Sequence, residues 1–236
     1  MLLQVKNLNF AYGDVQALWD INLEVGKGEV VALVGSNGAG KSTLLKNISG
    51  LLRPRKGSQI IFDGEDITNT TADVRVRKGI ALVPEGRQLF AGLTIRENLM
   101  MGAFTRSDVK AIQEDLERIF ALFPILEERQ AQLAGTLSGG EQQMCAIARG
   151  LMSNPKLLMI DELSLGLAPV VVDRLMETIQ TIHDNGVTVF LVEQDVQAAF
   201  QMSERGYVLE TGHLVHSGNS RDLMEDEAIK KAYLGI

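Results

Sequence analysis

The chain has 236 residues, of which 45% are hydrophobic, so it is long enough to bury a sizeable core as one large domain or two small lobes. Its formal net charge of −7 argues against a bulk electrostatic grip on nucleic acid, and we expect no nucleic-acid partner. The longest apolar stretches fall far short of the ~20 residues that a membrane-spanning helix needs, which argues against an integral membrane protein.

Short apolar strands alternate with amphipathic helices along the chain. The first strand pattern begins directly after Met1 and leaves no room for a signal peptide, so we expect the protein to stay in the cytoplasm. The strands expected from the pattern are residues 4–10, 30–34, 80–83, 157–161 and 187–192. Such alternation is typical of an α/β protein with a largely parallel sheet.

Residues 85–155 contain no convincing strand pattern and have strong helical periodicity. We interpret them as a helical lobe inserted into the sheet domain; the alternative is that these helices cover the sheet, as in any doubly wound fold. The single cysteine, Cys145, lies on an apolar helix face and is expected to be a packed side chain. After residue 192 the pattern predicts a short helix, a hairpin around Thr211 and Gly212, and a terminal helix at 225–232.

The most informative stretch follows the strand at 30–34 and fits the phosphate-loop pattern G-x-x-x-x-G-K-[ST]. It consists of Gly35, Ser36, Asn37, Gly38, Ala39, Gly40, Lys41, Ser42 and Thr43. Glycines let backbone N–H groups point at anionic oxygens, and the following helix adds its positive N-terminal end. Lys41 would then reach the β- and γ-phosphates, and Ser42 would bind Mg²⁺. The motif predicts a nucleoside triphosphate site, because an ordinary Gly-rich turn does not explain Lys and Ser in register.

Two further motifs carry groups suited to phosphate chemistry. The apolar strand at 157–161 delivers Asp161 and Glu162 to the sheet edge where the phosphate loop also lies, although such a strand end alone is usually just solvated. Asp161 suits the binding of Mg²⁺, and Glu162 suits the polarisation of an attacking water. A second stretch opens a helix upstream: Ser138, Gly139, Gly140 and Glu141. It is either a second anion-binding nest or a plain helix N-cap.

In this order and spacing, the phosphate loop, the 137–141 stretch and the 157–162 strand resemble the ATP-binding cassette (ABC) family over nearly the whole chain. The resemblance implies a P-loop NTPase-type fold with a mostly parallel sheet core, N-terminal antiparallel strands and an inserted α-helical subdomain. The chain would form a single ABC domain. Residues 1–84 and 156–236 would be its nucleotide-binding α/β core, and residues 85–155 its helical subdomain.

The resemblance also implies a head-to-tail dimer that sandwiches two ATP molecules. Each ATP would lie between the phosphate loop of one subunit and the Ser-Gly-Gly nest of the other. That geometry explains why one chain carries two half-sites for an anion. The partner subunit would be an identical chain or a longer relative.

Other roles transfer from the family residue by residue. Tyr12 matches the aromatic that stacks on adenine, and the alternative is a core tyrosine. Glu85 replaces the usual glutamine that touches Mg²⁺, and Gln194 replaces the usual histidine near the γ-phosphate. The loop at 164–167 ends in Leu167 where most members have aspartate. Each departure changes the chemistry that the position can offer.

The implied reaction is hydrolysis of Mg-ATP by in-line attack of water. Glu162 would be the general base, Lys41 would stabilise the γ-phosphate, and Gln194 would donate a hydrogen bond to the transferred group. The metal would be held by Ser42, Glu85 and Asp161. Rival interpretations are a soluble ABC ATPase outside transport and a nucleotide-binding scaffold that does not hydrolyse ATP.

Four strings resemble the shorter ATP-binding subunit of branched-chain amino acid importers. They are Val83-Pro84-Glu85-Gly86-Arg87, Ser164-Leu165-Gly166-Leu167-Ala168-Pro169, Val192-Glu193-Gln194 and Tyr233-Leu234-Gly235. Leu163 stands where that group usually has proline. Because leucine frees φ and restores an N–H, we expect a local change next to Glu162 and no loss of chemistry.

The expected partners beyond the second ATPase subunit are integral membrane permease subunits. They would dock around residues 85–101, for which the alternative is a simple connector. A periplasmic or extracytoplasmic solute-binding protein would be an indirect partner, and the chain would be peripheral on the inner face of the cell membrane. Amide or urea importers remain the alternative assignment of the solute.

Overall fold

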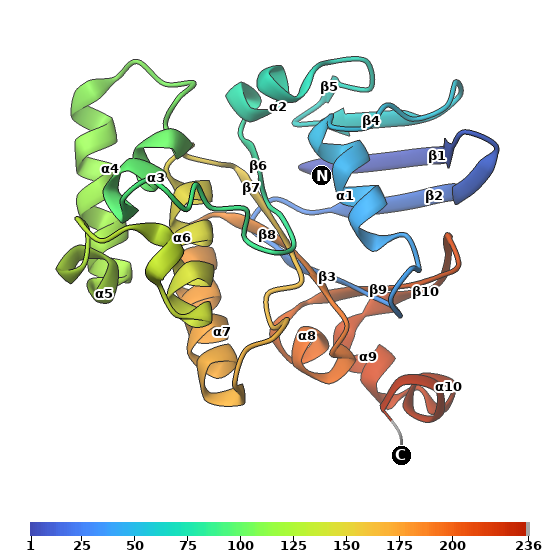
Figure 1. Cartoon of the computed structure of the whole chain (residues 1–236). Helices are drawn as coiled ribbons and strands as arrows, with labels where there is room; N and C mark the ends of the chain where they lie inside the picture. The colour runs from blue at the N-terminus through green and yellow to red at the C-terminus, as the bar shows by residue number, and fades with distance from the viewer. Residues whose placement is uncertain (235–236) are drawn as a thin grey trace.

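The computed structural model describes residues 1–234, and its strands form two sheets (Figure 1). The smaller sheet is antiparallel with the order β2-β1-β4-β5, and the larger has the order β10-β9-β3-β8-β7-β6. The strands are β1 (Leu3–Tyr12), β2 (Val15–Val25), β3 (Val30–Val34), β4 (Gln59–Phe62), β5 (Glu65–Asp66), β6 (Ile80–Val83), β7 (Leu157–Asp161), β8 (Thr188–Glu193), β9 (Arg205–Glu210) and β10 (His213–Asn219).

The larger sheet is parallel except at one edge, where β10 runs antiparallel to β9. Every residue of β3, β7 and β8 is buried, as expected of parallel strands that are covered on both faces. Parallel strands end at the same edge of a sheet. The segments that follow these three strands therefore meet there, and they carry the phosphate loop, Glu162 and Gln194.

Helices cover the larger sheet from both sides. They are α1 (Lys41–Ser49), α2 (Ala72–Lys78), α3 (Ile95–Gly102), α4 (Val109–Leu122), α5 (Pro124–Glu128), η1 (Ala134–Thr136), α6 (Gly139–Leu151), α7 (Pro169–Asp184), α8 (Val196–Met202), α9 (Ser220–Glu225), α10 (Glu227–Ile229) and η2 (Lys230–Leu234). In Figure 1, α3 to α6 gather on one side of this sheet, while α1 and the antiparallel sheet lie on the other.

Two large apolar clusters hold these layers together. One joins α3 to α7 to one face of the larger sheet, and the other joins α1 and the antiparallel sheet to the opposite face. A third, smaller cluster packs α8 and α9 against β3 and β9. Because the first cluster runs from the helices onto the sheet without a break, the division of the chain at residues 85 and 155 stays a prediction.

Helices α3 and α6 are locked together at Gly102. A Cβ atom at this position would lie 1.9 Å from the backbone oxygen of Arg149 on α6, a distance that real atoms do not show. Only glycine allows so close an approach of the two backbones. The helices α3 and α6 therefore form one packed pair.

Arg75 on α2 ties the helix that follows the phosphate loop to the rest of the core. Its side chain is buried and donates to the carbonyl oxygens of Asn47 and Ile48 at 2.6 and 2.9 Å, and to that of Thr68 at 3.0 Å. Burial lowers the pKa of Arg75 to about 10, so the guanidinium stays charged at neutral pH. A cation at the C-terminal carbonyls of α1 stabilises that helix end.

The expected α/β class and all five expected strands are confirmed, although β1 is longer than expected and β8 is shifted by one residue. The hairpin around Thr211 and Gly212 is confirmed as β9 and β10, and residues 85–155 contain helices but no named strand. The strands β2, β4 and β5 were not among those expected from the pattern. The terminal helix expected at 225–232 is present but begins two residues later, at Glu227, where α10 and η2 run on to Leu234; Asp226 separates it from α9. Gly235 lies outside the described residues.

Within residues 1–234, no helix combines the length and apolar character needed to cross a membrane.

Candidate functional site

A cavity of about 540 Å³ opens where the phosphate loop meets the antiparallel sheet. The phosphate loop and α1 form one wall, and the end of β1, the start of β2 and the β9–β10 turn form another. The lining residues are Tyr12, Val15, Gln16, Ala17, Asn37, Gly38, Gly40, Lys41, Ser42, Thr43, Glu85, Glu162, Leu165, Thr211 and Gly212. Of the phosphate-loop residues expected to bind nucleotide, Gly35, Ser36 and Ala39 do not line this cavity.

Glycines set the shape of the phosphate loop. Gly40 stands before α1 with φ of 109°, a conformation that residues with a side chain rarely adopt. A Cβ atom at Gly35 would lie 2.2 Å from the backbone oxygen of Leu209, so the loop packs against β9 at this point. The first turn of α1 consequently points its N–H groups into the cavity, which suits phosphate oxygens.

Lys41 and Glu162 form an ion pair at the bottom of the cavity. Lys41 Nζ lies 3.1 Å from Glu162 Oε1, and the two residues are only 4% and 9% exposed. Nζ also donates to the carbonyl oxygens of Gly35 at 2.8 Å and Ser36 at 3.3 Å. The ammonium group therefore lies inside the curl of the loop, with an acidic partner on its open side.

Asp161 lies next to this pair and offers a free carboxylate oxygen. Burial raises the pKa of Asp161, and a hydrogen bond with the Ser42 hydroxyl opposes that shift. Its Oδ1 atom is buried without a hydrogen-bond partner among the described residues. A buried oxygen of this kind needs a partner, and carboxylate and hydroxyl oxygens are the ligands that Mg²⁺ prefers. The Asp161 carboxylate and the Ser42 hydroxyl therefore fit a magnesium ion, and Glu85 lines the same cavity, although no three acidic, histidine or cysteine side chains of residues 1–234 form a metal-binding cluster by themselves.

Tyr12 ends β1 at the mouth of the cavity. Its ring packs edge-on against Phe10 with centroids 4.9 Å apart, and its hydroxyl lies 3.3 Å from the Thr43 hydroxyl. Half of the residue is exposed, so the alternative of a core tyrosine is wrong. The exposed ring is available to stack on a planar ligand.

The stretch Ser138 to Glu141 lies elsewhere, at the N-terminus of α6. Ser138 accepts from the Glu141 N–H and Glu141 accepts from the Ser138 N–H, which makes a complete capping box. These hydrogen bonds and Arg129 at 2.9 Å hold the pKa of Glu141 below its usual range. None of the four residues is among those lining the nucleotide cavity. The structure shows the helix N-cap of the two alternatives, and anion binding at this helix end stays a prediction.

Gln194 follows β8 and is exposed. Its backbone N–H donates to the carboxylate of Glu193 at 3.3 Å, and its side chain does not line the cavity. Sequence reasoning missed the lining contributed by Val15, Gln16 and Ala17 on β2 and by the β9–β10 turn. No sequence motif marks these residues. They reach the cavity through tertiary contacts, such as the hydrogen bond from the Trp19 N–H to the Gly212 carbonyl at 2.8 Å, which joins β2 to the β9–β10 turn.

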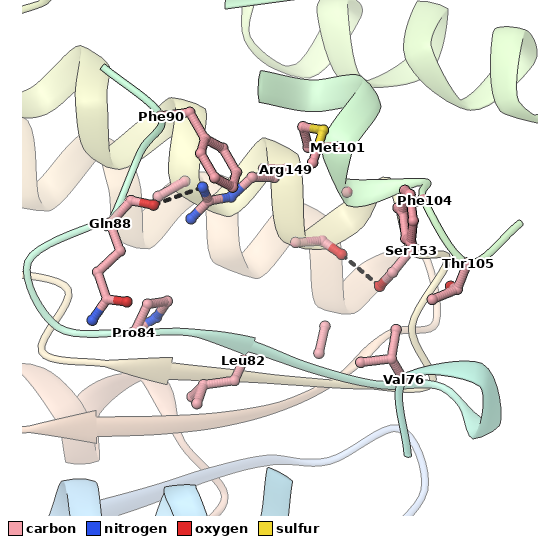
Figure 2. Close-up of a pocket in the computed structure, with 14 residues that line it drawn as sticks. Val76, Leu82, Pro84, Gln88, Phe90, Met101, Phe104, Thr105, Arg149 and Ser153 are labelled. Carbon is pink, nitrogen blue, oxygen red and sulfur yellow. Dashed lines mark hydrogen bonds between the residues drawn. The ribbon is translucent and has the colours of Figure 1, made fainter. Parts of the chain in front are cut away.

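A second cavity of about 480 Å³ lies between the packed pair α3–α6 and the end of β6 (Figure 2). Phe104, 81% exposed, lies on its rim, and Met101 and Phe90 are 41% and 47% exposed. Arg149 donates to the Gln88 carbonyl at 2.7 Å and lies 5.7 Å from the centre of the Phe90 ring. We refer to this surface as the α3–α6 groove.

Comparison with known proteins agrees with this architecture. A family model described as ABC transporter matches residues 18–164. The chain is 47% identical to BraG, a high-affinity branched-chain amino acid transport ATP-binding protein of Pseudomonas aeruginosa, over 99% of this chain and 100% of that protein. It is 36% identical to a probable branched-chain amino acid transport ATP-binding protein, LivF of Archaeoglobus fulgidus, over 100% and 99% of the two chains.

Solved structures give the same result. The crystal structure of the ADP conformation of MJ1267, an ATP-binding cassette of an ABC transporter, superposes with a TM-score of 0.87 at 26% identity, covering 100% and 99% of the chains. The dimeric post-hydrolysis state of the cassette MJ0796, bound to ADP and Pi, superposes with a TM-score of 0.81 at 25% identity, covering 93% of this chain and 99% of that one.

A phosphate loop between two sheets, with an acidic strand end beside it, defines an ATP-hydrolysing cassette. The chain belongs to the ABC transporter family and is an ATPase of that family.

Proposed function

We propose that this chain is the ATP-hydrolysing subunit of a membrane importer for the branched-chain amino acids leucine, isoleucine and valine. The observation that carries the proposal is the cavity in which Tyr12, the phosphate loop and Glu162 meet. The solute assignment is supported by the names of the BraG and LivF relatives, which both specify branched-chain amino acid transport.

The cavity suggests how the residues divide the reaction. ATP lies with its adenine on Tyr12 and its phosphates on the loop amides, and Lys41 exchanges its carboxylate partner for phosphate oxygens. Glu162 is then free to accept the proton of the attacking water. Gln194 does not line the cavity, so the hydrogen bond predicted from it to the transferred group requires its side chain to turn toward the phosphates. Most of the rate enhancement comes from positioning and from neutralising the charge on the phosphates.

The metal belongs to the same site. Ser42, Asp161 and Glu85 would hold Mg²⁺, which supplies positive charge to the β- and γ-phosphates when it is bound. The unpartnered Asp161 oxygen supports this assignment.

The separate nest at Ser138–Gly140 supports a sandwich dimer. Because one chain carries the nest and the phosphate loop on different surfaces, a second copy or a longer relative completes each site in a head-to-tail pair. The dimeric form of MJ0796 supports such pairing. Closure on ATP and opening after hydrolysis then drive the membrane subunits.

The α3–α6 groove is where we place the permease. Residues 85–101 contribute Phe90 and Met101 to its lining. Together with the exposed Phe104, these side chains offer apolar anchors beside the Arg149 guanidinium. A short cytoplasmic segment of an integral membrane subunit fits such a groove and keeps this chain at the inner face of the membrane, with the solute-binding protein on the opposite side.

A trapped dimer tests the enzymatic part of the proposal. We expect Glu162→Gln to elute from gel filtration as a dimer with Mg-ATP and to show almost no phosphate release, because the binding groups remain while the base is lost. Ser138 is exposed, so an arginine there would fill the proposed nest. The double variant Glu162→Gln, Ser138→Arg should therefore elute as a monomer. A Glu162→Gln protein that stays monomeric, or that releases phosphate at the wild-type rate, contradicts the assigned roles.

Transport assays test the rest. Phe104→Glu should abolish co-purification with the permease and leave ATP hydrolysis by the isolated chain unchanged, because the side chain faces solvent. Vesicles containing the assembled importer and its solute-binding protein should take up leucine. Uptake of amides or urea instead of leucine would replace the solute assignment, and failure of any membrane protein to co-purify would favour a soluble ATPase.

A further inference from the structure

Glu193 is a wholly buried carboxylate for which the mechanism above has no use. It ends β8 and accepts three hydrogen bonds: from the Ser164 N–H at 3.0 Å, the Ser164 hydroxyl at 2.8 Å and the Gln194 N–H at 3.3 Å. Burial raises the pKa of Glu193, and these donors oppose the shift. Burying a carboxylate costs free energy, and the three hydrogen bonds offset part of that cost. A carboxylate at such a position suggests a function beyond packing.

The segment from Glu162 to Ser164 is fastened to β8 at both ends. The Glu162 N–H donates to the Val192 carbonyl at 2.9 Å, and Ser164 is held by Glu193. Leu163 between them is fully buried in the core. Glu162 itself has φ of 55°, a left-handed conformation that costs of order 1–3 kcal/mol in a residue other than glycine and persists only where the surroundings enforce it.

The backbone of Glu162 matters because its side-chain partner is temporary. The carboxylate is now held by Lys41, which the proposed function assigns to phosphate oxygens once ATP binds. From that moment the direction of the Glu162 side chain depends on its backbone. Leu163 does not restrict φ as a proline would, so the restraint has to come from the hydrogen bonds around it.

We propose that Glu193 is a positioning residue for ATP hydrolysis, which acts through Ser164 to hold the backbone of Glu162 in the conformation that aims its carboxylate at the attacking water. The inference rests on the proposed role of Glu162 as general base. By binding the Gln194 N–H as well, the same carboxylate links the two segments that carry Glu162 and Gln194.

Two substitutions test this in the purified full-length chain. Glu193→Gln turns one acceptor into a donor, and Ser164→Ala removes the hydroxyl donor. Both should lower kcat of Mg-ATP hydrolysis by about 10- to 100-fold, the loss expected when a reacting group is misplaced. The dissociation constant for ATP should stay within about twofold of wild type, because the phosphate loop is untouched. Ser164→Thr keeps the hydroxyl and should recover most of the turnover lost in Ser164→Ala.

A matched control separates positioning from packing. The Ser203 and Ser220 hydroxyls form a buried 2.7 Å hydrogen bond away from the nucleotide cavity. Ser203→Ala removes a comparable bond, and it should lower thermal stability without changing kcat.

The outcomes are distinguishable. Wild-type kcat in Ser164→Ala, or a parallel loss of kcat and of ATP affinity, overturns the positioning role, and the Ser164 variants decide the question even where Glu193→Gln does not fold. If Glu162→Gln hydrolyses ATP at the wild-type rate, the proposed function itself fails, and this inference fails with it. If Glu162→Gln is inactive and Ser164→Ala is fully active, only this inference fails.

Discussion

Replacing Glu162 with glutamine should tighten the binding of ADP as well as stop hydrolysis. In the structure, Lys41 Nζ is shared between Glu162 and the carbonyl oxygens of Gly35 and Ser36. An incoming β-phosphate has to compete with the carboxylate for this ammonium group. The glutamine amide carries no charge, so the competition is weaker in the variant.

The size of the effect follows from the ion pair. At 3.1 Å and an effective dielectric constant of about 20, the Coulomb attraction between Lys41 and Glu162 is about 5 kcal/mol. Desolvation of the two buried groups offsets most of it. The remaining ~1–2 kcal/mol corresponds to binding that is about 5- to 30-fold tighter.

The measurement is a calorimetric titration with ADP in the presence of EDTA. ADP avoids hydrolysis and ATP-driven dimer closure, and the chelator removes any metal contribution. Glu85→Gln is the matched control, because it removes a carboxylate from the same cavity that has no ion pair with Lys41. Its effect should stay below about twofold, since Glu85 is exposed and its charge is screened.

An unchanged ADP affinity in Glu162→Gln would refute the competition between carboxylate and phosphate. So would an equal gain in Glu85→Gln, because it would show that overall charge, and not the ion pair, sets the affinity.

Three further predictions concern other groups. The hydrolysis rate should show no inflection near pH ~6.5, because the Gln194 amide does not titrate; an inflection that disappears on replacing one of the three histidines would contradict this. Arg75→Met should lower the free energy of unfolding in urea by about 3 kcal/mol through loss of its buried, charged hydrogen bonds, whereas Arg77→Met, at an exposed position on the same helix, should change it little. Burial raises the pKa of Cys145 to about 11, so at pH 8 only about one thiol in a thousand is ionised, and Ellman's reagent should react far more slowly with the folded chain than with the unfolded chain.

The central strands were predictable because burial on both faces demands a continuous apolar run, as in β7 and β8. The strand β2 was missed because its alternation changes phase. Leu18 is followed by Ile21, Leu23 and Val25 on the buried face, with Asp20 at φ of 44° where the register shifts. A bulge of this kind breaks the two-residue period on which strand prediction depends.

The start of the terminal helix was predicted two residues too early for a local reason. The Asp226 side chain accepts from the N–H groups of Ala228 and Ile229, so it caps a helix that begins at Glu227 and not at Glu225. An aspartate within a helical sequence pattern can therefore mark the N-cap of a helix and not a position inside it.

Part of the candidate site was predictable from the sequence and part was not. The phosphate loop is contiguous in sequence, and its motif alone places Lys41 and Ser42. The contribution of the β9–β10 turn depends on tertiary contacts, such as the 2.8 Å hydrogen bond from the Gly212 N–H to the Ala39 carbonyl. No local pattern encodes such a contact.

The close backbone contact at Gly102 has a mechanical consequence. The helices α3 and α6 cannot slide past each other at this contact, which lies near Arg149 at the C-terminal end of α6. A force applied to the rim of the α3–α6 groove would therefore tilt α6 and move Gly139 at its N-terminal end. About ten residues separate these points, or roughly 15 Å. A tilt of about 10° over that lever arm displaces the nest by roughly 3 Å, close to the length of one hydrogen bond. In the proposed sandwich dimer, a push of this size from the permease would make or break the contact between the N-terminus of α6 and a phosphate.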